Sequence, residues 1–421
     1  MQKVYVEHYG CWLNRALTEY IKQIILQHTT LAATLEDADI VVINTCAVRA
    51  ETERKILARV RQISSRGKRV AVTGCLVNVR PYSILEAAPQ ASLIDPSSLD
   101  DLHRFLKGED LQLVRTYKLE IHAYKHRGGV RYILPIQVGC LGSCGFCVEP
   151  IVRKNLVSLD PYLVVNLVSD AVKKGAKEIF LTGQDVATYG VDKGVKLTDL
   201  LKAILTEVDG EYMIRLGMME PWMVKNITRD LLELMKDKRV YKYLHLPLQS
   251  GDDEVLKLMG RKYTSSEYKD LIMFFRTGLK EVSVATDIIV GYPGESWEAF
   301  TKSLQIVREL KFDKVHVARY TFRPFTHAYL AGNTVSEPEK KKRSKLLVDA
   351  SLSVASEVNS KYVGKIIEVL VTEDEKKKGT MIARTNNYKP VIIPALFKPG
   401  ELIEVKIANS SPLYLVGEPV N

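Results

Sequence analysis

Cysteine is scarce in this sequence, with six residues among 421, and no stretch approaches the roughly 18 consecutive apolar residues that a membrane-spanning helix needs. The first residues also lack a basic segment followed by an apolar one, so no secretory signal is expected. We therefore expect a cytoplasmic protein with no membrane partner. Thiols stay reduced in that compartment, so the six cysteines favour metal, cluster or catalytic roles over disulfides.

Low-complexity tracts are absent too, and a share of 46% hydrophobic and 26% charged residues supplies both a core and a solvated surface. A chain of 421 residues is too long for one ordinary core, so two or three domains are expected. The net charge of +10 favours a polyanionic partner such as nucleic acid, although a solvated basic surface explains that charge equally well.

Residues 1–128 alternate short apolar strands with amphipathic helices. Strands are expected at 4–7, 40–43 and 70–72, and helices near 13–28, 49–65 and 79–87. This pattern predicts an α/β, flavodoxin-like N-terminal domain. A basic, glycine-containing stretch at 125–129 reads as a linker.

The alternation resumes over residues 131–335, with strands expected at 133–138, 178–181, 213–216, 243–246, 284–290 and 315–318. Six such units predict a partial (β/α)6 parallel barrel, because eight would close a full one. A charged linker helix is expected at 336–357. Residues 358–421 carry short strands separated by turns, which predicts a small all-β barrel that either binds nucleic acid or only caps the enzyme.

Three cysteines lie close together just after the first strand expected in the barrel. Cys140, Cys144 and Cys147, here called the second triad, are separated by three and then two residues in a glycine-containing loop. Such a loop can wrap three thiolates around one iron–sulfur cluster and leave one iron open for a chelating substrate. A structural zinc site would need a fourth ligand, and the nearby His122 and His126 have no matching spacing.

This spacing, with the aromatic Phe146 directly before the third cysteine, resembles the radical S-adenosylmethionine superfamily. The resemblance implies that the second triad holds a [4Fe-4S] cluster, whose open iron chelates S-adenosylmethionine for one-electron cleavage to a 5′-deoxyadenosyl radical. It also implies cofactor contacts at strand ends, where parallel α/β folds bind ligands. The residues concerned are Phe146, Gly183, Gln184, Arg215 and Gln249, each of which is also compatible with ordinary turn chemistry.

The other three cysteines, Cys11, Cys46 and Cys75, form the first triad and recur about one βα period apart. Each follows an expected strand by a few residues, so three parallel strands would deliver three thiols to the same sheet edge. Any one of them could be a small buried hydrophobe. Three at the same place in the repeat predict another cluster with an open iron.

With both triads in place, the whole chain resembles the methylthiotransferases, and its last domain resembles their TRAM domain. The matching blocks are 9–14, 44–49, 74–77, 182–185, 246–251 and 286–295. That family replaces an unactivated C–H bond by C–S–CH3. Polar acid–base catalysis cannot easily attack such a C–H bond. The resemblance implies two [4Fe-4S] clusters, with sulfur methylated at the first and the substrate activated by a radical made at the second. It also implies a separate electron donor and a sulfur donor.

Residues 384–390 resemble the archaeal and eukaryotic type, which acts on N6-threonylcarbamoyladenosine at position 37 in the anticodon loop of tRNA. Arg384, Tyr388 and Lys389 are then expected to bind RNA, with Tyr388 stacking on a base unless it belongs to the barrel core. Isopentenyladenosine and a ribosomal-protein aspartate are the alternative substrates within the family. A non-catalytic iron–sulfur RNA-binding or redox-sensing protein is the alternative from another class.

Three positions depart from the usual family pattern. Arg15 stands where an acidic or small residue is expected, and Lys154 and Phe325 stand where glycine is usual. None of them is a cysteine, so they bear on contacts around the sites and leave the chemistry intact.

Overall fold

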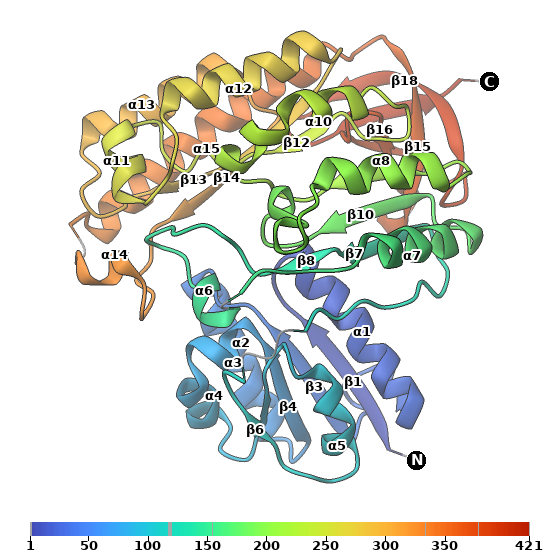
Figure 1. Ribbon diagram of the computed structural model, residues 1–421, viewed down its shortest axis with the longest axis vertical. Coiled ribbons are helices and arrows are strands. Elements are labelled where there is room, and N and C mark those ends of the chain that lie inside the picture. Colours follow the sequence, from blue (N-terminus) through green and yellow to red (C-terminus); the bar gives the residue numbers. More distant parts are fainter. Residues whose placement is uncertain (1, 117–119, 154, 333, 378, 421) are drawn as a thin grey trace.

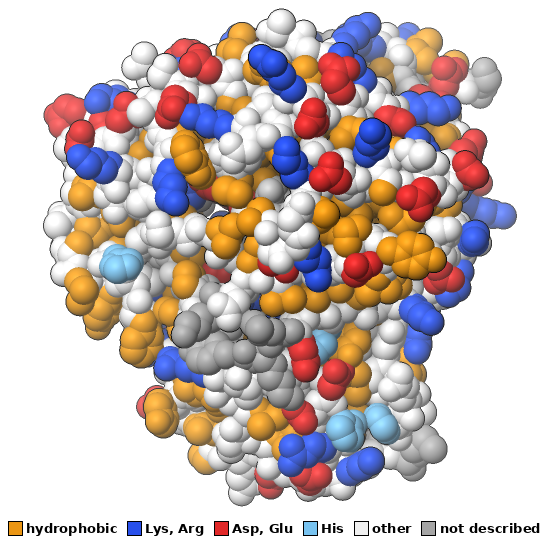
Figure 2. Space-filling view, viewed as in Figure 1, with side chains coloured by type: hydrophobic (Ala, Val, Ile, Leu, Met, Phe, Trp, Pro, Cys, Tyr) orange, Lys and Arg blue, Asp and Glu red, His pale blue; other side chains and the backbone are white. Residues whose placement is uncertain are grey.

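The computed structural model describes residues 2–116, 120–153, 155–332, 334–377 and 379–420. In Figure 1 an N-terminal α/β unit lies below a larger α/β unit, and a small all-β unit lies behind the upper right. Among the described residues no helix is both long and apolar enough to cross a membrane. On the face drawn in Figure 2, basic and acidic side chains are intermixed over the upper part.

The N-terminal unit is built on a six-stranded parallel sheet in the order β2-β1-β3-β4-β5-β6. Its strands are β1 (Lys3–His8), β2 (Thr30–Leu31), β3 (Ile40–Thr45), β4 (Arg69–Gly74), β5 (Ser92–Ile94) and β6 (Gln112–Leu113). This order confirms the predicted flavodoxin-like arrangement. Sequence periodicity missed β2, β5 and β6 because they are only two or three residues long.

The helices of this unit are α1 (Trp12–His28), α2 (Ala50–Ser64), α3 (Cys75–Val79), α4 (Pro81–Ala87), the 3-10 turn η1 (Leu99–Asp101) and α5 (Leu102–Leu106). Buried residues of α1 such as Leu17 and Ile21 belong to the same core cluster as Val4 and Ile40 of the sheet. Trp12, at the start of α1, packs edge-on against Phe180 of the next unit with ring centroids 4.8 Å apart. Helix α1 therefore contacts both units.

The larger unit has two three-stranded parallel sheets, β11-β10-β7 and β12-β13-β14. Parallel bridges Ile214↔Val240 and Met218↔His245 join them, so six strands follow one another in space as in the chain. This confirms the predicted partial barrel. The strands are β7 (Arg131–Pro135), β10 (Glu178–Thr182), β11 (Met213–Leu216), β12 (Tyr243–His245), β13 (Ser283–Val290) and β14 (Lys314–Arg319).

A short antiparallel pair, β8 (Gln137–Val138) and β9 (Val157–Ser158), flanks the loop of the second triad. The helices are α6 (Glu149–Val152), α7 (Pro161–Lys173), α8 (Leu197–Glu207), α9 (Pro221–Val224), α10 (Thr228–Leu234), α11 (Asp253–Leu258), α12 (Ser265–Gly278), α13 (Trp297–Leu310), α14 (His327–Leu330) and α15 (Glu337–Ser360). Three 3-10 turns are η2 (Val186–Thr188), η3 (Val191–Lys193) and η4 (Lys225–Ile227). The predicted charged helix corresponds to α15.

The C-terminal unit is a closed barrel in the order β15-β16-β17-β19-β18. Its strands are β15 (Ile366–Lys377), β16 (Thr380–Thr385), β17 (Pro390–Pro394), β18 (Leu402–Ser410) and β19 (Leu415–Pro419). Alternate residues such as Met381 and Ala383 point inward, which gives the period of two expected for a strand with one buried face. The turn between β16 and β17 reaches the larger unit, where Lys242 N donates to Asn386 O at 2.9 Å.

We predict that Gly74→Ala destabilises the fold strongly. Gly74 has φ +91°, and an added Cβ would lie 2.3 Å from the carbonyl oxygen of Thr45. Overpacking costs about 1–3 kcal/mol and left-handed backbone about 1–2 kcal/mol, so chemical denaturation should show a loss of roughly 3 kcal/mol. Gly67→Ala is the control, since Gly67 has φ +72° but no atom within 4 Å of the added carbon. Equal losses in the two variants would contradict this account.

Candidate functional site

The first triad lies at the carboxyl edge of the N-terminal sheet, as the sequence predicts. Cys11 directly precedes α1, Cys46 directly follows β3, and Cys75 opens α3 directly after β4. Strands β1, β3 and β4 are neighbours, so their ends place the thiols in one region. A Cβ added at Gly10 would lie 3.2 Å from Cys46 Sγ, which shows how closely the first loop approaches the second.

The thiols of this triad have raised pKa values. Burial raises the pKa of Cys46, and it raises the pKa of Cys75 well above the ordinary thiol value. Such thiols stay protonated until a metal takes the place of their protons. All six cysteines are free, and three thiols at one sheet edge form a donor set that fits an iron–sulfur cluster.

The second triad is held by hydrogen bonds to its sulfur atoms. Gly142 N donates to Cys140 Sγ at 3.2 Å, and Glu149 N donates to Cys147 Sγ at 3.4 Å. Burial raises the pKa of Cys140 to about 12, while the Gly142 N–H lowers it. Donors aimed at sulfur stabilise the thiolate that iron requires, so this loop also fits a cluster.

Arg261 is a part of this site that the sequence did not reveal. Its Nη1 donates to Cys144 Sγ at 3.1 Å, and its Nε donates to Tyr263 Oη at 2.9 Å. Its Nη2 bonds Glu220 across the same space. Arg261 follows α11, far along the chain from the cysteine loop, and a single arginine in a turn carries no recognisable pattern.

The Gly183–Gln184 turn holds the cysteine loop in place. A Cβ at Gly183 would lie 2.8 Å from the amide group of Gln137, so glycine is needed for this close approach. Gln184 Oε1 accepts from Gly139 N at 2.9 Å, and its amide nitrogen donates to Glu149.

Phe146, Asp185 and Gln249 lie in loops that follow strands of the larger unit, and the predicted contact of Phe146 and Gln249 with the cofactor stays a prediction. Phe146 packs edge-on against Tyr292 with ring centroids 6.3 Å apart. Gln249 has φ +70°, and its buried Oε1 lacks a hydrogen-bond partner among the described residues. Asp185, which the sequence analysis did not single out, has an equally unpartnered Oδ2, and burial raises its pKa to about 7. Unpartnered buried oxygens are rare and suit a polar ligand.

Helix α6 connects the two triads, and in Figure 1 it lies between the two α/β units. It begins two residues after Cys147 and contacts α3, which carries Cys75. Asn78 of α3 donates to the carbonyl oxygen of Val152 at 3.2 Å. The carboxylate of Glu149 adds to the rise in pKa of both Cys75 and Cys147, so it lies near thiols of both triads.

A cleft of about 790 Å³ runs from Cys11 and Cys46 into the partial barrel and ends at the C-terminal unit. His245 Nε2 and Asp287 Oδ2 meet at 2.7 Å in its wall. His316 lines the same wall, and burial together with the nearby His245 lowers its pKa to about 4, so it is neutral near pH 7. Together these three side chains offer ring nitrogens and a carboxylate to a ligand in the cleft.

The residues expected to bind RNA line this cleft. Tyr388 packs against Tyr241 and Tyr243 with ring centroids 4.9 and 5.1 Å apart, so it belongs to the junction of two units rather than to the barrel core. Lys389 is buried and its Nζ bonds Asp313 and Asn359. Their contact with RNA stays a prediction, as does the expected contact of Arg215 with the cofactor. Arg215 lies deep in the same cleft.

Two of the three departures from the family pattern fall on described residues. Arg15 is exposed, with its guanidinium carbon 5.3 Å from the Trp12 ring centroid. Phe325 has φ +66°, a conformation that glycine adopts without strain, and its exposed ring lies 5.1 Å from the guanidinium carbon of Arg115. Lys154 falls outside the described residues.

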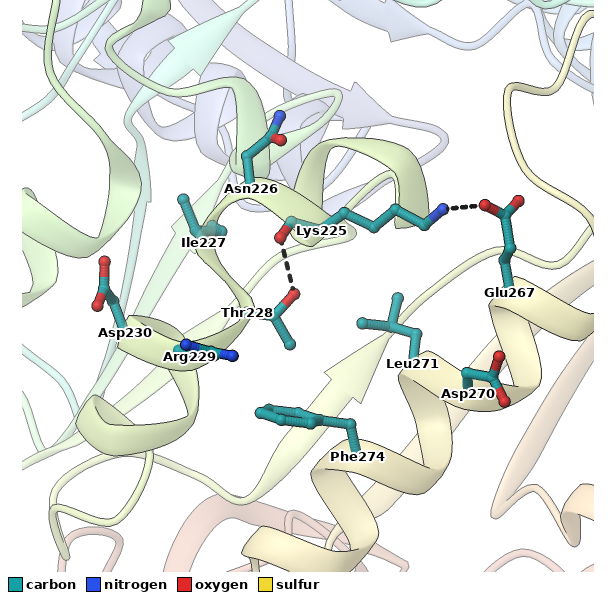
Figure 3. A pocket seen from close by; sticks show the side chains of 10 residues that line it. All are labelled: Lys225, Asn226, Ile227, Thr228, Arg229, Asp230, Glu267, Asp270, Leu271 and Phe274. Atoms are coloured by element: carbon teal, nitrogen blue, oxygen red, sulfur yellow. Dashed lines mark hydrogen bonds and ion pairs between the residues drawn. The ribbon is translucent and has the colours of Figure 1, made fainter.

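A separate pocket of about 570 Å³ lies between the η4–α10 segment and α12, where Lys225 pairs with Glu267 (Figure 3). No cysteine lines it, and it shares no lining residue with the cleft.

Comparison with known proteins places these features in a family. Residues 134–307 match the radical SAM superfamily, residues 3–95 match the uncharacterized protein family UPF0004, and residues 360–420 match the TRAM domain. A probable threonylcarbamoyladenosine tRNA methylthiotransferase from Pyrococcus horikoshii is 40% identical over 99% of both chains. The chain belongs to the radical S-adenosylmethionine methylthiotransferase family.

Other members of this family are similar along their whole length. A probable threonylcarbamoyladenosine tRNA methylthiotransferase from Methanocaldococcus jannaschii is 37% identical over 99% of this chain and 96% of its own. A tRNA-2-methylthio-N(6)-dimethylallyladenosine synthase from Nitratiruptor sp. is 31% identical over 100% of this chain and 99% of its own. The radical S-adenosylmethionine methyltransferase TsrM from Kitasatospora setae shares only the fold, with a TM-score of 0.59 and 13% identity over 78% of this chain and 77% of its own.

Membership of this family implies S-adenosylmethionine and iron–sulfur clusters, which fit the donor sets described above.

Two ion pairs attach α2, directly after the first triad's Cys46 loop, to the end of the partial barrel. Arg323 pairs with Glu53, and both side chains are less than a tenth exposed. Arg319 pairs with Glu51, and both side chains remain partly open to solvent.

We predict that Glu53→Ala costs about 3–5 kcal/mol of unfolding free energy, because it leaves the buried Arg323 unpaired. Glu51→Ala, two residues earlier on the same helix, should cost no more than about 1 kcal/mol, because its ion pair is solvated. Chemical denaturation of the two variants measures both values. Similar small losses would show that the buried pair does not hold the units together.

Proposed function

We propose that the chain is a tRNA methylthiotransferase that converts N6-threonylcarbamoyladenosine at position 37 into its 2-methylthio derivative. The observation that carries this proposal is the cleft that joins the first triad to residues 387–389 of the C-terminal barrel. Relatives named for this substrate are 33–40% identical along their whole length. Those named for dimethylallyladenosine are 29–31% identical, which makes that base the second candidate.

We assign one [4Fe-4S] cluster to Cys140, Cys144 and Cys147 and another to Cys11, Cys46 and Cys75. A cluster with an open iron supplies one electron to S-adenosylmethionine, and this chemistry makes an unactivated C–H bond reactive. Around the second triad, Arg261 stabilises the Cys144 thiolate through the hydrogen bond to its sulfur. Asp185 and Gln249 offer unpartnered oxygens to the polar groups of the cofactor.

The cleft suits a nucleoside, with the first triad at one end as the source of sulfur. Its aromatic side chains, Trp12, Tyr243 and Tyr388, offer ring faces on which a base from an opened anticodon loop can stack. The TRAM-like barrel borders the same opening, so it can hold the RNA around the inserted base. An electron donor and a sulfur donor complete the set of partners.

We predict that Cys144→Ala and Cys46→Ala separate the two functions. With reconstituted protein, S-adenosylmethionine, a reductant and tRNA that carries threonylcarbamoyladenosine, the unchanged chain should release 5′-deoxyadenosine and form the methylthio nucleoside. Cys144→Ala should lose both products, because the radical site is broken. Cys46→Ala should still release 5′-deoxyadenosine but form no methylthio nucleoside. Nucleoside mass spectrometry and chromatography measure the two products.

Methylthiolated product from the Cys46→Ala variant would contradict the division of roles. Activity of the unchanged chain on isopentenyladenosine alone would move the assignment to the second candidate. Binding of S-adenosylmethionine without any 5′-deoxyadenosine would favour a non-catalytic sensor.

A further inference from the structure

Arg215, deep in the cleft, is a buried cation without an ion-pair partner among the described residues. It is 5% exposed, and its guanidinium carbon lies 4.8–5.0 Å from the ring centroids of Phe180, Tyr243 and Tyr388. Its Nε has no hydrogen-bond partner among the described residues. The nearby acid Glu178 is already bound by Arg131 and by the Tyr241 hydroxyl group. A buried charge in this state is costly unless a ligand pairs with it.

Two more cations face the same part of the cleft. Lys314, the first residue of β14, is exposed to the cleft and forms no ion pair among the described residues. Burial by the cleft walls, then Arg384 and Arg215, lowers its pKa. Arg384 pairs with Glu373 at 3.1 Å, but its buried Nε has no hydrogen-bond partner in the described part of the chain. The acids near these three cations are already engaged by other side chains, since Glu178 and Glu373 also bond Arg131 and the Asp287 of the cleft bonds His245.

Tyr388 is held under strain between these cations. Its φ is +68°, and left-handed backbone costs a non-glycine residue about 1–2 kcal/mol. The neighbouring Asn387 anchors the turn by donating to Glu281 O at 2.8 Å and to Tyr362 Oη at 2.7 Å. The guanidinium carbons of Arg215 and Arg384 then lie 4.9 and 4.7 Å from the Tyr388 ring centroid. Strain of this kind is typical of positions that a ligand site requires.

We propose that Arg215, Lys314 and Arg384 form an anion subsite that binds the carboxylate of the substrate's threonylcarbamoyl group. This inference rests on the proposed function and assigns Arg215 to the substrate rather than to the cofactor. A carboxylate suits guanidinium and ammonium donors, whereas an isopentenyl group offers no charge to them. The subsite would thus select the modified base by its charge. A phosphate of the RNA backbone has related chemistry, so the experiment must tell the two anions apart.

The test compares N6-threonylcarbamoyladenosine with its methyl ester, which keeps the shape but removes the charge. Isothermal titration of the reconstituted full-length chain should show that the free acid binds roughly tenfold more tightly than the ester. Lys314→Met should remove most of this preference, because it deletes an unpaired charge and keeps an unbranched side chain only one atom shorter. Lys365→Met, on the exposed pair with Glu281, is the matched control and should keep the preference. Arg215→Met should act like Lys314→Met if thermal melting shows it folded.

Equal binding of acid and ester by the unchanged chain would overturn the subsite, as would a Lys314→Met variant that keeps the full preference. The phosphate alternative is tested with tRNA that has an unmodified adenosine at position 37. If Lys314→Met weakens the binding of this unmodified tRNA as much as the binding of the modified tRNA, the anion is a phosphate and the proposal is wrong. Preference for the acid in a chain that makes no methylthio product would support the subsite while the proposed function fails. Methylthio product formed by a chain that binds acid and ester equally would support the proposed function while the subsite fails.

Discussion

The buried ion pair between Arg323 and Glu53 is the contact on which the arrangement of the two triads depends. It joins the end of the partial barrel to α2, the helix that follows Cys46. Such a pair tolerates little displacement, because moving Glu53 away would leave the Arg323 charge buried and unpaired. The contact of α3 with α6 adds a second attachment close to Cys75 and Cys147. The first triad is thereby fixed beside the barrel, at one end of the cleft.

The positions of the cysteines could be predicted from the sequence because parallel strands impose a strict rule. The carboxyl ends of such strands meet at one edge, so residues that closely follow each strand come together. Cys11, Cys46 and Cys75 satisfy this rule after β1, β3 and β4. The second triad needs no long-range prediction, since its three residues share one short loop. The same periodicity of strands and helices identified all three units of the fold.

Contacts between distant segments could not be predicted in this way. Arg261 reaches Cys144 across 117 residues of chain, and no local pattern marks either residue for the other. Asp185 and Glu149 acquire their roles only when burial removes water around their carboxylates. Short strands such as β2 and β6 hold too few residues to show a period.

The turn of the C-terminal barrel shows a related limit. Arg384, Tyr388 and Lys389 are expected to bind RNA, and the structure places Tyr388 and Lys389 at the junction with the larger unit. The sequence contains the residue types but not their direction, which is set by the anchoring of Asn387 to Glu281 and Tyr362. Because of that anchoring, the TRAM-like barrel completes the wall of the cleft, and cluster, aromatic rings and cations border one shared space.

Two separate three-thiol sites in one chain are the central proposal, and iron counting tests it most directly. Anaerobic reconstitution should give about eight irons per chain, and about four in each variant in which one triad is replaced by alanine. Residual iron should thus be found whichever triad is removed. Loss of all iron on removal of either triad, or the finding of a single zinc in place of iron, would contradict it.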